Sequence, residues 1–268
     1  MESTDMGNNI VKIDLEEENE NKKVKKHQNN SNSDLTESTC CFSGPQINYI
    51  NLTENDELLS TNGIEKTTKS KIVIETMILN SYIYVHSDNR RLMSAKRSLK
   101  GFNIYDLRTN ELMCHLNANI FGTKYSMNKC EIINEISESF NVDENVIKEG
   151  RQYKSKYLPP LEVIYDVKFL KRDKPRNFNL SLGQLQLQNK KPIYNPDSNS
   201  YSLNFSGRVT IASVKNFQII HPLDPTFITL TFGKEGSNSY ILDFTHPWNS
   251  LQAFCVGLTA LDHKLGFE

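Results

Sequence analysis

From Lys71 onward the sequence alternates short apolar runs with turn-forming residues. Within LSLGQLQLQ and ITLTF the apolar residues recur at every second position, which is the period of a half-buried strand. Twelve such short strands indicate a closed barrel or a sandwich, and closure hides strand edges more economically. The predicted strands are 72–78, 81–86, 91–95, 102–107, 112–117, 122–127, 162–169, 178–188, 201–205, 216–221, 227–232 and 239–244. The polar insert 128–158 between them is predicted to be a loop with at most a short helix.

The C-terminal stretch HPWNSLQAFCVGLTALDHKLGFE has helical character instead. Residues 253–261 contain one polar residue, Thr259, so the helix is apolar nearly all round and must be enclosed. Gly257 lowers the stability of the helix, and this cost is expected where the surrounding barrel wall approaches the helix backbone closely. Pro247 suits the first turn of the helix, Lys264 suits its last turn, and Gly266 suits the C′ position after it. We therefore predict a mainly β protein, a closed antiparallel barrel of about twelve strands around a central hydrophobic C-terminal α-helix.

Residues 1–68 lack any hydrophobic period and are rich in Asn, Glu, Lys and Ser. This composition predicts a disordered polar and acidic N-terminal tail, which leaves 69–268 as the folded domain. The basic block 22–26 is interpreted as a solvated charge block, with a nuclear-import signal as the alternative. Two apolar patches, 11–15 and 47–59, are candidate docking motifs for protein partners.

Charge is unevenly distributed along the 268 residues, whose formal net charge is −1. Residues 1–70 carry 13 acidic and 7 basic residues, which leaves 19 acidic and 24 basic residues in 71–268. The domain is therefore mildly basic, which suits an anionic partner without requiring one.

Several classes of protein are excluded by missing motifs. The five cysteines have no zinc-type spacing and the six histidines form no HxxxH or HExxH pair, so neither a metal site nor a disulfide framework is expected. No GxGxxG, GxxxxGK[ST] or GxSxG run occurs, and nothing indicates an enzyme or a cofactor. The sequence shows no secretory leader and no apolar run of about 20 residues, so we expect a cytoplasmic protein without a transmembrane span.

Long phrases of mixed residue type then identify a family. LNFSGRVTIASVKNFQIIHPLDP (203–225) and LDFTHPWNSLQAFCVGLTALDHKLGFE (242–268) closely resemble the C-terminal signature of the tubby-like family. Upstream, NANIFGTKY (117–125), VIYDVKF followed by KPRNF (163–178), and LQNKKPIYNPDSNSYSLNF (187–205) match in the same order. The resemblance spans about 71–268 and is strongest in the last part of the chain.

The resemblance implies the same architecture, a twelve-stranded barrel around a hydrophobic helix, and a role that is not enzymatic. Tubby-like domains bind phosphoinositides, chiefly phosphatidylinositol 4,5-bisphosphate, and tether cargo or regulators to the inner plasma-membrane leaflet. Relatives carry membrane proteins into cilia, and a transcriptional role after release from the membrane has been proposed for them. The implied protein is a monomeric, peripheral membrane adaptor whose tail recruits protein partners.

A headgroup with several phosphates needs converging Lys and Arg donors. The run RRLMSAKRSLKG offers Arg90, Arg91, Lys96, Arg97 and Lys100 around one short strand. Because the family's ligand-contacting residues come from a basic strand at this place, the resemblance assigns the role to Lys96 and Arg97, with Lys100 as a third. The alternative is a solvated turn between two strands.

One position departs from the family. An Arg that contacts the headgroup in the family is replaced here by Asn117. An amide donates to phosphate without charge, and a lost charge-assisted bond costs on the order of 1.5–3 kcal/mol, which would weaken binding or change the preferred lipid. His115 and Lys124 lie nearby in the sequence and are candidates to compensate.

Other conspicuous polar residues are interpreted as structural. Lys174 to Arg176 fit a turn, with a lipid contact as the alternative. Arg208 and Lys215 are expected to make hydrogen bonds within the barrel. His221 and Asp224 are expected to stabilise a turn before Pro225.

Three other functions stay open beside the phosphoinositide-binding adaptor. A nuclear DNA-binding transcription regulator would use the basic domain and block 22–26, although no recognition helix is apparent. A scramblase-like protein would bring the apolar helix into the bilayer. A protein-interaction barrel that has lost its lipid site would explain Asn117.

Overall fold

A computed structural model describes residues 10–13, 48–50, 56–61, 66–76, 80–127, 130–139, 149–166 and 176–262. Its centre is a closed barrel of twelve strands in which every neighbouring pair is antiparallel. In order around the barrel these are β11 (Leu161–Tyr165), β12 (Phe178–Leu182), β13 (Leu185–Asn189), β16 (Phe217–His221), β17 (Asp224–Gly236), β18 (Ser239–Phe244), β3 (Ser70–Thr76), β4 (Asn80–His86), β5 (Arg91–Ser98), β6 (Gly101–Asp106), β7 (Leu112–Ala118) and β8 (Lys124–Met127). The predicted fold class is confirmed.

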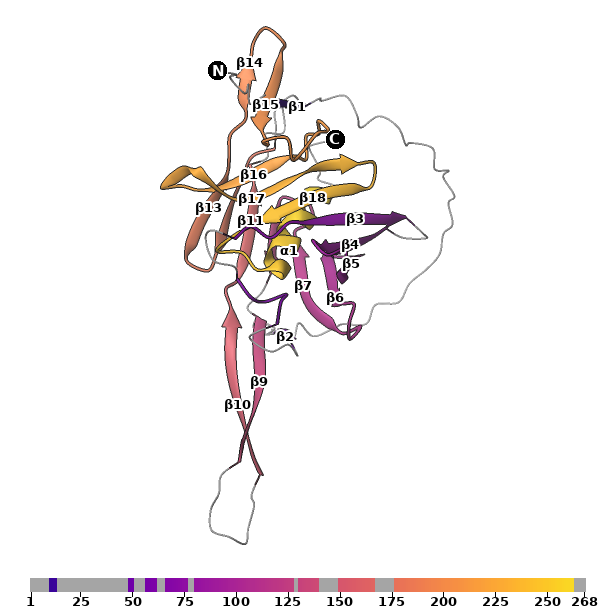
Figure 1. Ribbon diagram of the computed structural model, residues 1–268, viewed down its shortest axis with the longest axis vertical. Coiled ribbons are helices and arrows are strands. Elements are labelled where there is room, and N and C mark those ends of the chain that lie inside the picture. The colour runs from indigo at the N-terminus through magenta and orange to yellow at the C-terminus, as the bar shows by residue number, and fades with distance from the viewer. Residues whose placement is uncertain are drawn as a thin grey trace, which may run out of the picture.

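The helix α1 (Ser250–Leu261) runs through the barrel, and all of its residues are buried (Figure 1). The core around it consists mainly of aromatic and aliphatic side chains from the inner faces of the strands, including Tyr84, Phe102, Phe178 and Phe232. The predicted close approach at Gly257 is also confirmed. A Cβ there would lie 2.5 Å from Ile72 Cδ1 on the barrel wall.

The predicted boundaries of this helix were wrong. The N-cap is Asn249, whose side chain accepts a 2.8 Å hydrogen bond from the Gln252 N–H, so Pro247 precedes the helix. The C-cap is Asp262. Lys264 and Gly266 lie outside the described residues.

Two of the predicted strands were assigned wrongly, although the total of twelve is correct. The run 178–188 forms two strands, because Gly183 adopts a left-handed φ of 61° and turns β12 into β13. The run 201–205 is not in the barrel. It contributes β15 (Ser200–Asn204), which pairs with β14 (Ile193–Asn195) and β1 (Ile10–Ile13) in a separate three-stranded sheet.

The prediction that the insert 128–158 is a loop was wrong. It contains β9 (Cys130–Ser139) and β10 (Glu149–Leu158), which pair along their whole length and project from the barrel (Figure 1). A third strand, β2 (Asn48–Ile50), runs parallel to β9. Cross-strand pairing outside the barrel thus overrides the polar composition from which a loop was predicted.

Part of the segment 1–68 packs on the barrel. Leu58 and Leu59 are 0% and 6% exposed, and the Leu58 carbonyl accepts a hydrogen bond from the Leu251 N–H in the first turn of α1. Leu58 and Leu59 are therefore part of the core, so within the 47–59 patch these two residues face inward instead of toward a partner. Most of the predicted tail lies outside the described residues, and the boundary at residue 68 stays a prediction.

Candidate functional site

The candidate site lies where β5, β6 and β7 are neighbours in the barrel. Burial alternates along β6: Phe102 and Ile104 are buried inside, whereas Asn103 and Tyr105 are half-buried on the outer face. The register places Lys96 opposite Asn103, and Asn103 opposite His115. Lys96 is therefore on the outer face, where its ammonium lies 5.9 Å from the centre of the Tyr105 ring.

Lys100 and Asn117 lie at the end of this face. Leu99 and Lys100 form the turn between β5 and β6, and Gly101 pairs with Asn117. The Lys100 carbonyl accepts a 2.7 Å hydrogen bond from the Ala118 N–H, which fixes the turn against β7. Gly101 is required there, because its φ is 124° and a Cβ would overlap the Leu116 carbonyl oxygen. Lys100 and Asn117 thus lie together at one corner, and Lys96 lies on the same face further along β5, with its ammonium toward Tyr105.

Arg97 points the other way. Successive residues of a strand face opposite sides of the sheet, and Arg97 pairs with the inward-facing Phe102. Its guanidinium lies 5.4 Å from the Phe102 ring centre and forms an ion pair with Asp262, the C-cap of α1. The Asp262 side chain is 1% exposed and the Arg97 side chain 48%, so the pair closes the rim of the barrel.

Asp262 has a second partner in Tyr125, whose hydroxyl donates a 2.7 Å hydrogen bond to Oδ2. Burial raises the pKa of Tyr125 well above its ordinary value, so the hydroxyl keeps the proton that it donates. Asp262 is therefore held by groups from two strands of the barrel, and the end of α1 is fixed to the wall.

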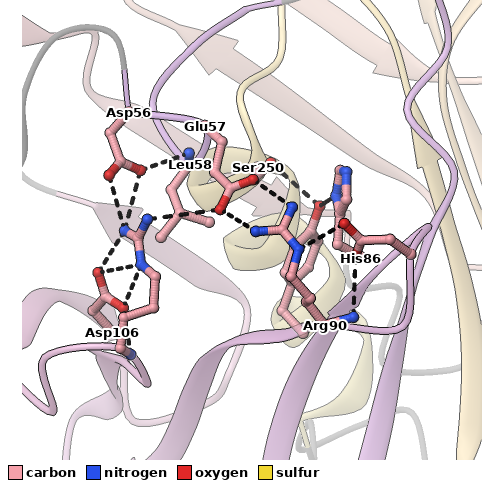
Figure 2. A network of polar contacts seen from close by, with 10 residues as sticks. Asp56, Glu57, Leu58, His86, Arg90, Asp106 and Ser250 are labelled. Carbon is pink, nitrogen blue, oxygen red and sulfur yellow. Dashed lines mark hydrogen bonds and ion pairs between the residues drawn. The ribbon is translucent and has the colours of Figure 1, made fainter.

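The remaining members of the basic run are used elsewhere. Arg90 forms a two-bond ion pair with Glu57, at 2.7 and 2.8 Å, and a further contact of 2.6 Å with Asp88 (Figure 2). The hydrogen bond from Arg90 is the main cause that lowers the pKa of Glu57. Arg91 pairs with Glu75. These two arginines therefore do not join Lys96, Lys100 and Asn117.

Figure 2 shows how the segment around Leu58 is held at the end of the barrel where α1 begins. Arg108 contacts Asp56, Glu57 and Asp106, with its shortest contact, 2.7 Å, to Asp106. Together with Arg90 it holds the two acidic residues, Asp56 and Glu57, that directly precede the apolar Leu58. This cluster binds a segment of the chain itself, at the end of the barrel opposite to Asp262.

The two candidates for compensating the Asn117 replacement are both engaged. His115 Nδ1 lies 2.8 Å from Asn103 Oδ1, and Lys124 Nζ lies 2.6 Å from Glu162 Oε1 on β11. His115 shares the outer face with Lys96, whereas the charge of Lys124 is balanced by its carboxylate partner.

Arg208 and Asp224, two of the residues interpreted as structural, behave as expected. Arg208 holds Asp243 through two hydrogen bonds of 2.7 and 3.1 Å. Asp224 accepts bonds from the Thr226 and Phe227 N–H groups at the start of β17. Arg176 is 8% exposed and donates to the Ala260 carbonyl near the end of α1, so a lipid contact is excluded for this residue in this conformation. Lys174 and Pro175 lie outside the described residues.

Three exposed apolar side chains next to the site were not predicted from the sequence. Leu99 in the β5–β6 turn is 104% exposed, and Ile120 and Phe121 in the β7–β8 loop are 93% and 53% exposed. Their signal in the sequence was two apolar residues within NANIFG and one between Ser98 and Lys100, positions that strand periodicity does not explain.

Among the described residues, no helix has the length and apolar character required to cross a membrane.

The sequence profile of the Tub family matches residues 179–263. Tubby-related protein 1 of Mus musculus is 52% identical over 84 residues, which cover 31% of this chain and 16% of the mouse protein. Tubby-related protein 3 of Homo sapiens is 49% identical over 84 residues, 31% of this chain and 19% of the human protein. Protein king tubby 2 of Aedes aegypti is 46% identical over 84 residues, 31% and 20% of the two chains. The matched segment thus spans a fifth or less of these relatives, and the profile match does not include Lys96, Lys100 or Asn117.

Proposed function

From the premise that this chain is a tubby-like protein, we propose that it binds phosphoinositide headgroups, phosphatidylinositol 4,5-bisphosphate first among them. The barrel would thereby tether the chain to the inner leaflet of the plasma membrane as an adaptor without enzymatic activity. Its N-terminal segment would recruit protein partners.

The observation that supports this proposal is that Lys96, Lys100 and Asn117 lie on the same outer face near the β5–β6 turn. Lys96 lies two residues along β5 from the Ser98–Gly101 pair, a distance of about 7 Å along the strand. Two flexible ammonium groups and one amide donor on the same face are suited to binding several phosphate oxygens.

Arg97 belongs to this site in a different way. A guanidinium has five N–H donors, and one carboxylate occupies at most two of them. With 48% of its side chain exposed, Arg97 keeps donors for a phosphate at the rim while Asp262 holds it. Its substitution would also disturb the fold, so it is a poor residue for testing lipid binding alone.

The test is co-sedimentation of the full chain with vesicles that contain phosphatidylinositol 4,5-bisphosphate or phosphatidylserine at equal surface charge. The variant Lys96→Ala/Lys100→Ala removes the proposed site, and Lys66→Ala/Lys69→Ala removes the same charge from exposed residues just before β3, at the opposite end of the barrel. We expect preferential binding to the phosphoinositide that the first variant loses and the second keeps.

Other results would reject the proposal. Equal binding to both lipids and to duplex DNA would indicate a basic surface without a specific headgroup site, in line with a nucleic-acid-binding role. No binding to either lipid would favour a protein-interaction barrel in which Asn117 marks a lost site.

A further inference from the structure

Three fully or largely exposed apolar side chains lie together beside the candidate site. Leu99 occupies the β5–β6 turn, and Ile120 and Phe121 occupy the β7–β8 loop. The 2.7 Å hydrogen bond between the Ala118 N–H and the Lys100 carbonyl joins the two turns, so these residues project from the same end of the barrel. Single exposed apolar residues need no explanation, but three at two adjoining turn tips do.

The loop that carries Ile120 and Phe121 is held in place from within. The Asn119 side-chain oxygen accepts hydrogen bonds from the Thr123 and Lys124 N–H groups at 2.7 and 3.0 Å, and its amide donates to the Thr123 hydroxyl at 2.8 Å. Gly122 closes the loop with a φ of 64°. The apolar side chains are therefore presented outward by a fixed loop, and their exposure does not result from a lack of local structure.

The charge around the tips selects the kind of partner. Lys100 is adjacent to Leu99, and Lys96 lies further along the outer face of the same hairpin. Glu162 on β11 is balanced by Lys124 at 2.6 Å. Projecting apolar side chains flanked by lysines fit the interface of an anionic bilayer, where apolar groups enter the acyl boundary and ammonium groups stay among the headgroups.

We propose that Leu99, Ile120 and Phe121 form a wedge that inserts into the membrane interface while the neighbouring basic corner holds a headgroup. This inference rests on the proposed function and adds to it a second, apolar contribution to membrane affinity. It also sets the orientation of the protein: the end of the barrel at which α1 terminates faces the bilayer.

The experiment separates the wedge from the headgroup site by using two ligands. Vesicles with phosphatidylinositol 4,5-bisphosphate offer both contributions, whereas soluble inositol 1,4,5-trisphosphate offers the headgroup alone. The variant Leu99→Ser/Ile120→Ser in the full chain should lower vesicle affinity about tenfold or more and leave trisphosphate affinity within about twofold. The control is Leu223→Ser, since Leu223 is 88% exposed in the turn between β16 and β17 at the opposite end of the barrel.

A second measurement reports insertion directly. Ile120→Trp places an indole on the wedge, and lipids brominated on the acyl chains should quench it, while the enclosed Trp248, which is 0% exposed, is not quenched.

The outcomes distinguish the two proposals. Unchanged vesicle binding in Leu99→Ser/Ile120→Ser, or an unquenched indole, overturns the wedge and leaves the headgroup site intact. An equal loss for vesicles and trisphosphate overturns it as well, because the tips would then belong to the headgroup site. If the wild-type chain binds both vesicle types equally and ignores trisphosphate, but the variant binds vesicles less, the wedge stands and the proposed function falls. A wild-type chain that binds no vesicles rejects both.

Discussion

Substitution of Arg97 tests whether the ion pair at the barrel rim stabilises the fold. Arg97→Ala would remove the guanidinium that forms an ion pair with the carboxylate of Asp262, which is 1% exposed. Breaking a fully buried pair costs about 3–5 kcal/mol, whereas an exposed pair is worth about 0–1 kcal/mol. Because 48% of the Arg97 side chain is exposed, we expect a loss of about 2 kcal/mol in the free energy of unfolding.

A double-mutant cycle isolates the charge. In Asp262→Asn the hydroxyl of Tyr125 keeps an acceptor, but no buried charge remains to be orphaned. In that background, Arg97→Ala should lower the free energy of unfolding by only about 0.5 kcal/mol, which is the contribution of the contact between the guanidinium and the Phe102 ring.

The assay is urea unfolding followed by the fluorescence of Trp248, the single tryptophan, which is enclosed in the barrel. An equal loss for Arg97→Ala in both backgrounds would refute the reasoning, because the effect would then not depend on the charge of Asp262. A wild-type stability in Arg97→Ala would show that water already satisfies the carboxylate.

Three further predictions use the same assay. Gly257→Ala should lower the free energy of unfolding by about 1–2 kcal/mol in spite of the better helix propensity of alanine, because the new methyl would lie 2.5 Å from Ile72 Cδ1. Ile72→Val should recover part of this loss. If Gly257→Ala is instead more stable than the wild type, the barrel wall moves to accommodate the methyl. Leu58→Ala should cost about 2–4 kcal/mol, since Leu58 is 0% exposed, and no loss would mean that its segment does not pack on the barrel in solution. Burial raises the pKa of Tyr165 to about 12, so the folded state retains a proton that the unfolded chain loses near pH 10. Stability should therefore be level with respect to this group below about pH 10 and fall by about 1.4 kcal/mol per unit as the pH rises toward 12. Tyr165→Phe should lack this share of the decline, and an identical alkaline profile would contradict the assignment.

The architecture could be predicted because two periodicities are strong. Alternation by two marks strands that face a core on one side, and the unbroken apolar character of 253–261 required enclosure. Which strand pairs with which is not encoded in those periods. The run 201–205 alternates as well as any other, yet its partners are β14 and β1, outside the barrel.

The candidate site was predictable only in part, for a geometric reason. The basic run lies on one strand, β5, but neighbouring residues on a strand face opposite sides, so Lys96 and Arg97 could not both be on the outer face. That separation becomes visible only once register and the position of Asp262 are known. Leu58 shows the reverse case, in which composition indicated a solvated tail and two leucines within it pack in the core.

The enclosure of α1 has a consequence for how the chain is made. The barrel is closed by β18 against β3, a contact that joins residues 239–241 to 71–73 and spans most of the domain. Since a ribosome delivers the chain from its N-terminal end, the earlier strands must wait with their apolar inner faces uncovered until β18 and α1 emerge. Such distant pairing predicts slow folding after synthesis and a need for protection by chaperones during that interval.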